Sequence, residues 1–213
     1  MTTSDSLDEL SWWRHDEPTD EELYLSGGLL VEDWPHARQV SLLSTQLFEA
    51  TLPLHSLNVR ALQQLERAAL LHNTGMLVES RRHHKHSFRL INETPLPDFS
   101  DEERYEIACI ARYHRRALPS PAHEEFAALN RSARKRVSAL AALLRVADAF
   151  DFNHDGRVLR LAAEPELSNQ RIWTILLWVR PLADLDAELE HAYAKADLFE
   201  RTFKHKLRFV IQE

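Results

Sequence analysis

The chain has 213 residues, of which 44% are hydrophobic and 28% charged, and its formal net charge is -7 at pH 7. This length suffices for one substantial core, or for a main domain with a small appendage, while the acidic balance excludes a general nucleic-acid binder, which needs a basic surface. No apolar run approaches the roughly 20 residues that cross a bilayer, and the start MTTSDSLDEL lacks a signal-peptide pattern, so we expect a cytoplasmic protein without membrane association.

A polar arm, residues 1–30, precedes a region over residues 31–153 in which the apolar spacing is helical and predicts a helical bundle. The first helix of this bundle carries a histidine on its core-facing stripe, with steps of four, three and four between His36, Val40, Leu43 and Leu47. Asn58 caps a second helix, which ends near Gly75 and carries His72 on its buried face.

Three further helices are predicted in the same region. One starts around His86 and ends before a pair of prolines. A capping box that begins at Ser100 opens the next, whose apolar stripe ends at His114. The longest helix, over residues 130–152, places Asp148 beside its apolar side.

The pattern changes after residue 153. Gly156 marks a turn, and the segments RVLRLAAEPEL and RIWTILLWVRP have the composition of β-strands. An amphipathic helix over residues 184–203 and a last strand at KLRFVIQE follow. Residues 154–213 are therefore predicted to form a small β-α-β appendage on a mainly α protein.

Charge and cysteine usage narrow the site chemistry. One cysteine, Cys109, excludes an internal disulfide framework and any cysteine-built zinc site. Basic residues form three clusters, around residues 81–89, 112–116 and 131–136, and the first two lie beside histidines. Clusters of this kind are often only solvated faces, but the adjacent histidines favour an anionic ligand.

One constellation resembles a known superfamily. An early histidine, a histidine followed by a polar residue, and a distant helical aspartate follow the ligand order of the HD superfamily of metal-dependent phosphohydrolases: His36, His72 with Asn73, and Asp148. The segments LLHNTGMLVESRRHHKHSFRLI, IARYHRRALPS and LAALLRVADAFD are also similar to the helical C-terminal domain of the exopolyphosphatase and guanosine pentaphosphate phosphatase (Ppx/GppA) family, over residues 34–155. The resemblance implies an HD-domain helical bundle with a small C-terminal α+β appendage.

The resemblance also implies a ligand set. His36, His72 and Asp148 would hold a divalent ion, Mn, Mg, Fe, Ni or Zn, and His86 with His114 is a candidate second site. His72, Asn73 and Asp148 are the candidate catalytic residues. Asn73 stands where the superfamily has aspartate, and an amide oxygen coordinates weakly and carries no charge. By itself, a histidine on an apolar stripe is more often a satisfied core residue.

Further residues are candidates for phosphate contact or for support of the helix ends. The predicted phosphate-binding side chains are Arg82, His83, His84, Lys85, Arg115 and Arg145. Arg145 is also an alternative, structural partner for Asp148, because it lies three residues earlier on the same helix face. The helix-end residues Asp151, His154 and Asp155 are interpreted as caps of that helix and the following turn rather than metal ligands.

Two functions remain open at this level. In the first, the chain is a metal-dependent phosphohydrolase acting on a phosphate ester, a nucleotide or a phosphoanhydride. In the second, it is a catalytically degenerate HD module that binds polyphosphate or a nucleotide, or docks on a separate phosphatase. The family assigns its phosphoanhydride chemistry to two preceding actin-like domains, for which this chain has neither the room nor a glycine-rich phosphate loop. Whether the chain forms a homodimer is left open.

Overall fold

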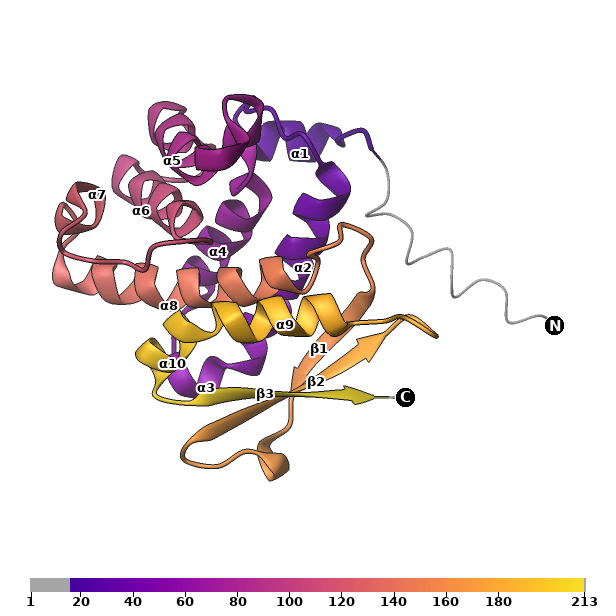
Figure 1. Cartoon of the computed structure of the whole chain (residues 1–213). Helices are drawn as coiled ribbons and strands as arrows, with labels where there is room; N and C mark the ends of the chain where they lie inside the picture. Colours follow the sequence, from indigo (N-terminus) through magenta and orange to yellow (C-terminus); the bar gives the residue numbers. More distant parts are fainter. Residues whose placement is uncertain (1–15, 213) are drawn as a thin grey trace.

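The structure, a computed structural model, describes residues 16–212 and is mainly helical with one small sheet, as predicted (Figure 1). The helices are α1 Asp20–Leu25, α2 Trp34–Ala50, α3 Leu52–His55, α4 Val59–Leu71, α5 His83–Glu93, α6 Asp101–Arg112, α7 Glu124–Ala127, α8 Arg131–Ala149, α9 Asp186–Lys195 and α10 Asp197–Phe203. The strands are β1 Val158–Ala163, β2 Ile172–Val179 and β3 Lys206–Gln212. Within the described residues, no helix combines the length and apolar character that a membrane span requires.

Four helices build the core that positions the site. α2 and α6 each pack against both α4 and α8, and α5 lies over α6 (Figure 1). Their facing side chains are fully buried, as at Leu43, Leu65 and Leu144. The predicted cap of α4 is present, since Asn58 accepts a hydrogen bond from the Ala61 amide at 3.1 Å. The capping box at the start of α6 is also confirmed.

The C-terminal segment forms a mixed sheet in the order β1-β2-β3. β1 and β2 are antiparallel, whereas β3 runs parallel to β2, so the chain crosses over between them through α9 and α10. The sheet is joined to α2, because Gln39 donates to the Val158 carbonyl and Trp173 donates to the Ala50 carbonyl at 3.1 Å. One hydrophobic cluster extends through both parts, and the domain boundary near residue 153 stays a prediction.

Several element boundaries differ from those predicted. α5 begins at His83 rather than around His86, because a 3₁₀ turn, Ser80–Arg82, leads directly into it. The helix predicted over residues 184–203 is divided at Ala196 into α9 and α10. The predicted polar arm contains a short helix, α1, that begins with a capping box; residues 1–15 of that arm lie outside the described residues.

Candidate metal centre

The three predicted metal ligands come together from three helices. His36 lies in the first turn of α2, His72 follows the last residue of α4, and Asp148 lies near the end of α8. One ligand atom of each residue lies within 4.8 Å of the others. Within residues 16–212 no other group of three or more histidine, cysteine, aspartate or glutamate side chains is close enough to share an ion.

The two imidazoles direct the same ring nitrogen toward the carboxylate. Nε2 of His36 lies 3.5 Å from Oδ1 of Asp148, and Nε2 of His72 lies 3.3 Å from the same oxygen. Both Nε2 atoms are buried and have no hydrogen-bond partner. Buried polar atoms are normally satisfied, so two unsatisfied nitrogens facing one carboxylate oxygen fit a site for a cation.

The opposite ring nitrogens fix the orientation of these imidazoles. Nδ1 of His72 donates to the Ala69 carbonyl at 2.6 Å, which leaves the lone pair on Nε2. Nδ1 of His36 lies 2.8 Å from Oδ2 of Asp151, and the Gly156 amide donates to Oδ1 of Asp151 at 2.8 Å. Asp151 therefore caps the following turn, as interpreted from the sequence, and also orients His36, as carboxylates behind metal-binding histidines do.

The three candidate ligands, His36, His72 and Asp148, differ in their protonation states. Burial disfavours the charged form of His36, but the nearby carboxylates of Asp148 and Asp151 raise its pKa to about 9. Burial lowers the pKa of His72, which stays neutral. Although burial opposes ionisation of Asp148, Lys195 and the two imidazoles hold the pKa of its carboxyl well below the usual range. His36 is therefore protonated at neutral pH, and an ion at Nε2 would have to displace that proton.

The raised pKa of His36 predicts how the free energy of unfolding depends on pH. The pKa of His36 is higher in the folded protein, about 9, than its ordinary value of 6.5, so protonation favours folding fully below pH 6.5 and this contribution disappears as the pH rises to 9. With a chelator present, we expect the free energy of unfolding to fall across this interval by on the order of 2 kcal/mol. Urea denaturation at several pH values measures it. His36→Asn should remove the slope and His205→Asn should keep it; a slope that survives in His36→Asn would contradict the assignment.

A second pair of histidines lies beside the first. Nε2 of His83 lies 3.1 Å from Nε2 of His114, and both Nδ1 atoms donate to main-chain carbonyls, at 2.8 and 2.6 Å. Burial lowers the pKa of both rings, to about 4 for His83. Because both rings are neutral and both Nδ1 atoms carry the hydrogen, the two Nε2 lone pairs face each other. This arrangement suits a cation or a shared proton between the two Nε2 atoms. The ring of His114 also lies edge-on to that of His72, with centroids 5.0 Å apart.

The structure thus pairs His114 with His83, whereas His86 of the predicted second site has its Nε2 3.4 Å from Oε2 of Glu79. The residues buried on α5 follow steps of one, three and four, at His83, His84, Ser87 and Ile91. Counting back from Ile91 in steps of four would have identified His83 and Ser87 as the inward-facing positions.

The predicted phosphate-binding residues divide into two groups. Arg115 lies against His83, with Nη1 3.3 Å from its Nδ1, and Nδ1 of the adjacent buried His84 has no partner. Burial, and after it the charges of Arg112, Arg115 and Arg116, lowers the pKa of His84 to about 3, so several arginines lie near this ring. The remaining three candidates have other surroundings: Arg82 pairs with Glu79 on the surface, Lys85 is exposed, and Arg145 is buried and bonded to the α9–α10 junction.

The carboxylate of Asp148 has a partner that the sequence did not indicate. Nζ of Lys195, from α9, contacts Oδ2 of Asp148. Arg145, the partner considered from helix spacing, instead pairs with Asp197 at 2.9 Å. Lys195 is 47 positions from Asp148 in sequence, so no local pattern could reveal the contact.

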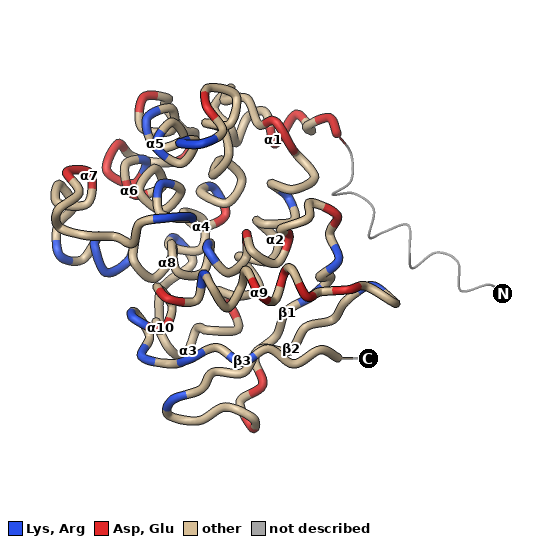
Figure 2. The backbone as a smooth tube through the Cα atoms, viewed as in Figure 1, with Lys and Arg blue, Asp and Glu red and all other residues tan. Residues whose placement is uncertain are grey.

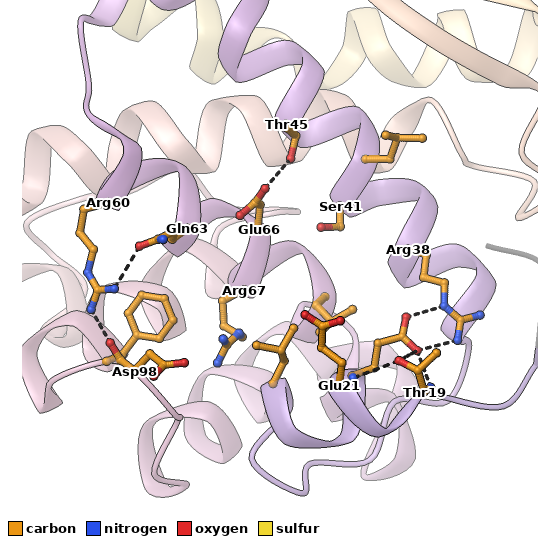
Figure 3. Close-up of a pocket in the computed structure, with 15 residues that line it drawn as sticks. Thr19, Glu21, Arg38, Ser41, Thr45, Arg60, Gln63, Glu66, Arg67 and Asp98 are labelled. Carbon is orange, nitrogen blue, oxygen red and sulfur yellow. Dashed lines mark hydrogen bonds and ion pairs between the residues drawn. The ribbon is translucent and has the colours of Figure 1, made fainter. Parts of the chain in front are cut away.

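Two cavities lie elsewhere on the molecule. One, of about 720 Å³, is lined by α1, α2, α4 and the segment before α6 (Figure 3). Several of its polar side chains pair with one another, as Arg38 does with Glu22 and Thr45 with Glu66. The other, of about 740 Å³, is a basic cleft where the N-terminal half of α8 meets α10; the cationic residues lining it are Arg131, Arg134, Lys135, Arg136 and Arg201. Figure 2 marks the Lys and Arg positions of α8 and α10 in blue. Neither cavity includes His36, His72 or Asp148 in its lining.

Comparison with known proteins gives two findings. The family described as Ppx/GppA phosphatase, domain III, matches this chain over residues 31–191. A guanosine-5'-triphosphate,3'-diphosphate pyrophosphatase of Pseudoalteromonas translucida (strain TAC 125) is 38% identical over 66 residues, which are 31% of this chain and 13% of that protein. The similarity to this relative therefore covers only a small part of its length.

Proposed function

The chain belongs to the Ppx/GppA phosphatase family through the family's domain III, and from this premise we propose that it is a divalent-metal-dependent phosphohydrolase domain acting on polyphosphate or on a nucleotide phosphate. The observation that carries the proposal is the pair of buried, unsatisfied Nε2 atoms of His36 and His72 facing Oδ1 of Asp148. Two imidazoles and one carboxylate suit Mn, Fe, Ni, Mg or Zn and leave coordination positions open.

Each residue has a distinct part in this proposal. A bound divalent ion would supply polarisation of a phosphate oxygen and activation of water. His36, His72 and Asp148 would hold the ion, and Asp151 keeps the ring of His36 turned toward it. Arg115, at the positive edge beside His83 and His84, would stabilise the phosphate anion. The facing nitrogens of His83 and His114 would take a second cation.

A second candidate function rests on Asn73. Its side-chain oxygen is buried without a hydrogen-bond partner, so the position is as unsatisfied as the two imidazole nitrogens, but it offers an ion no negative charge. A degenerate domain would keep the positive edge and bind a phosphorylated ligand or polyphosphate without hydrolysing it, or dock on a separate phosphatase.

Substitution of Asn73 by aspartate decides between the two functions. The new carboxylate adds a charged ligand beside His72, so we expect the Asn73→Asp variant to bind Mn²⁺ on the order of tenfold more tightly and to hydrolyse phosphate compounds faster. Isothermal titration with Mn²⁺ and release of inorganic phosphate from a panel of nucleotides and polyphosphate measure both effects. Asn130→Asp, at the exposed N-cap of α8 where a carboxylate also accepts the capping hydrogen bond, is the control for an added charge.

The wild-type protein gives the deciding comparison. If it already hydrolyses one of these compounds and gains only modestly from the substitution, the enzyme reading holds. If it is inactive but binds polyphosphate in a salt-sensitive way, the binding function holds, because that attraction depends on the basic edge. If neither protein hydrolyses or binds any of these compounds at low salt, both readings fail and docking on a partner phosphatase is left.

A further inference from the structure

Lys195 brings a positive charge from the appendage to the carboxylate of the candidate metal centre. It is the last residue of α9, and its Nζ contacts Oδ2 of Asp148 on α8. Oδ1 of the same carboxylate faces the two imidazoles. Both side chains are largely shielded, with 20% of Lys195 and 12% of Asp148 exposed. The two oxygens of Asp148 are therefore divided between an ammonium group and the metal-ligand position.

The position of Lys195 is fixed by its neighbours. Arg145, which is 3% exposed, donates from Nε to the Lys195 carbonyl at 3.4 Å and pairs with Asp197 at 2.9 Å. These bonds hold the junction of α9 and α10 against α8, and Figure 1 shows α9 running alongside α8. The ammonium thus reaches Asp148 from an anchored helix end, unlike a lysine on a free surface.

This arrangement has two consequences for an ion at the site. With Oδ2 engaged by the ammonium, only Oδ1 is available, so the carboxylate binds through one oxygen. A fixed positive charge next to the only anionic ligand also repels a dication, because water screens two charges only partly at such a short distance. We propose that Lys195 limits the affinity of the His36, His72 and Asp148 site for divalent ions, a regulation that rests on the proposed function.

Neutralising Lys195 tests the proposal. Titration calorimetry with Mn²⁺ on the full chain would compare wild type with Lys195→Met, which keeps the apolar stem, and with Lys195→Arg, which keeps the charge. Lys195→Met is expected to bind Mn²⁺ on the order of tenfold or more tightly, while Lys195→Arg stays close to wild type. Lys135→Met is the matched control: this lysine is exposed on the same helix as Asp148, about 20 Å away along its axis.

The possible outcomes distinguish a failure of this inference from a failure of the proposed function. Equal affinity in wild type and Lys195→Met overturns the inference and leaves the metal site intact. Weaker binding in Lys195→Met also overturns it, since the lysine would then be a positioning residue for the carboxylate. Absence of Mn²⁺ binding in all four proteins overturns both. Binding by Lys195→Met alone supports the inference in its strongest form. Circular dichroism checks folding, and Lys195→Gln replaces Lys195→Met if the latter is unfolded.

Discussion

Replacement of Asp148 by alanine is expected to abolish divalent-metal binding. The substitution removes one of three strong ligands and the only anionic one, so the ion would face two imidazoles and the ammonium of Lys195. We expect the affinity for Mn²⁺ to fall more than about 100-fold, because loss of supporting second-sphere groups alone costs roughly 10- to 100-fold. Metal content after equilibration and dialysis, together with calorimetry, measures the loss. The rise in thermal stability that Mn²⁺ gives wild type should vanish as well.

Two further variants make this result specific. His36→Ala should cause the same loss, since it removes the second ligand without changing the carboxylate. Asp155→Ala removes an equal charge from a half-buried pair with Arg157 and should bind Mn²⁺ as wild type does. Unchanged metal content in both Asp148→Ala and His36→Ala would place any bound metal outside this site.

The convergence of the candidate ligands could be anticipated in part because each histidine belongs to a local pattern. His36 lies on the apolar stripe of one helix and His72 at the end of another, and helical spacing alone fixes which way such residues face. The order of the two histidines and Asp148 along the chain, which resembles the ligand order of the HD superfamily, predicted that the three side chains share one site. Both histidines are buried, as the helical spacing predicts, with exposed fractions of 2% for His36 and 0% for His72.

What could not be anticipated depends on contacts between distant segments. The pairing of Asp148 with Lys195 joins α8 to α9 across 47 residues, and the break at Ala196 that directs this lysine inward interrupts no apolar pattern. The error at α5 has a local origin instead. A start near His86 misses the 3₁₀ turn before His83 and places the beginning of the helix nearly one turn too late. The histidine that meets His114 is His83, not the His86 that the family resemblance implied.

Gly75 has a different role from the helix end predicted for it. The glycine was interpreted as the end of the second helix, yet α4 ends at Leu71 and the left-handed backbone expected of a glycine cap is absent. The absence of a side chain at Gly75 lets the backbone of α5 pack directly against it. A Cβ at this position would lie 2.2 Å from the His83 carbonyl oxygen and 2.5 Å from the Ser87 amide nitrogen, so α5 rests directly on this backbone.

Gly75→Ala is therefore expected to be among the most damaging single methyl additions in the protein. The two clashing atoms belong to the backbone of α5, so relief requires moving the helix. That movement would strain the bonds from the Gly75 amide to Ser87 Oγ and from Ser87 Oγ to the His72 carbonyl, at 2.9 and 2.7 Å. We expect a loss of about 3 kcal/mol in the free energy of unfolding, and a melting temperature lower by roughly 10 °C.

Gly28→Ala provides the matched control for this substitution. Its added Cβ would meet nothing within 4 Å, but its φ of +81° disfavours any side chain, so about 1 kcal/mol of backbone strain is expected without a clash. Urea denaturation compares the two variants. A cost for Gly75→Ala no larger than that for Gly28→Ala would show that α5 can shift away freely. A large cost accompanied by weaker Mn²⁺ binding would show that the contact between α5 and the glycine also holds His72, and with it the metal centre, in place.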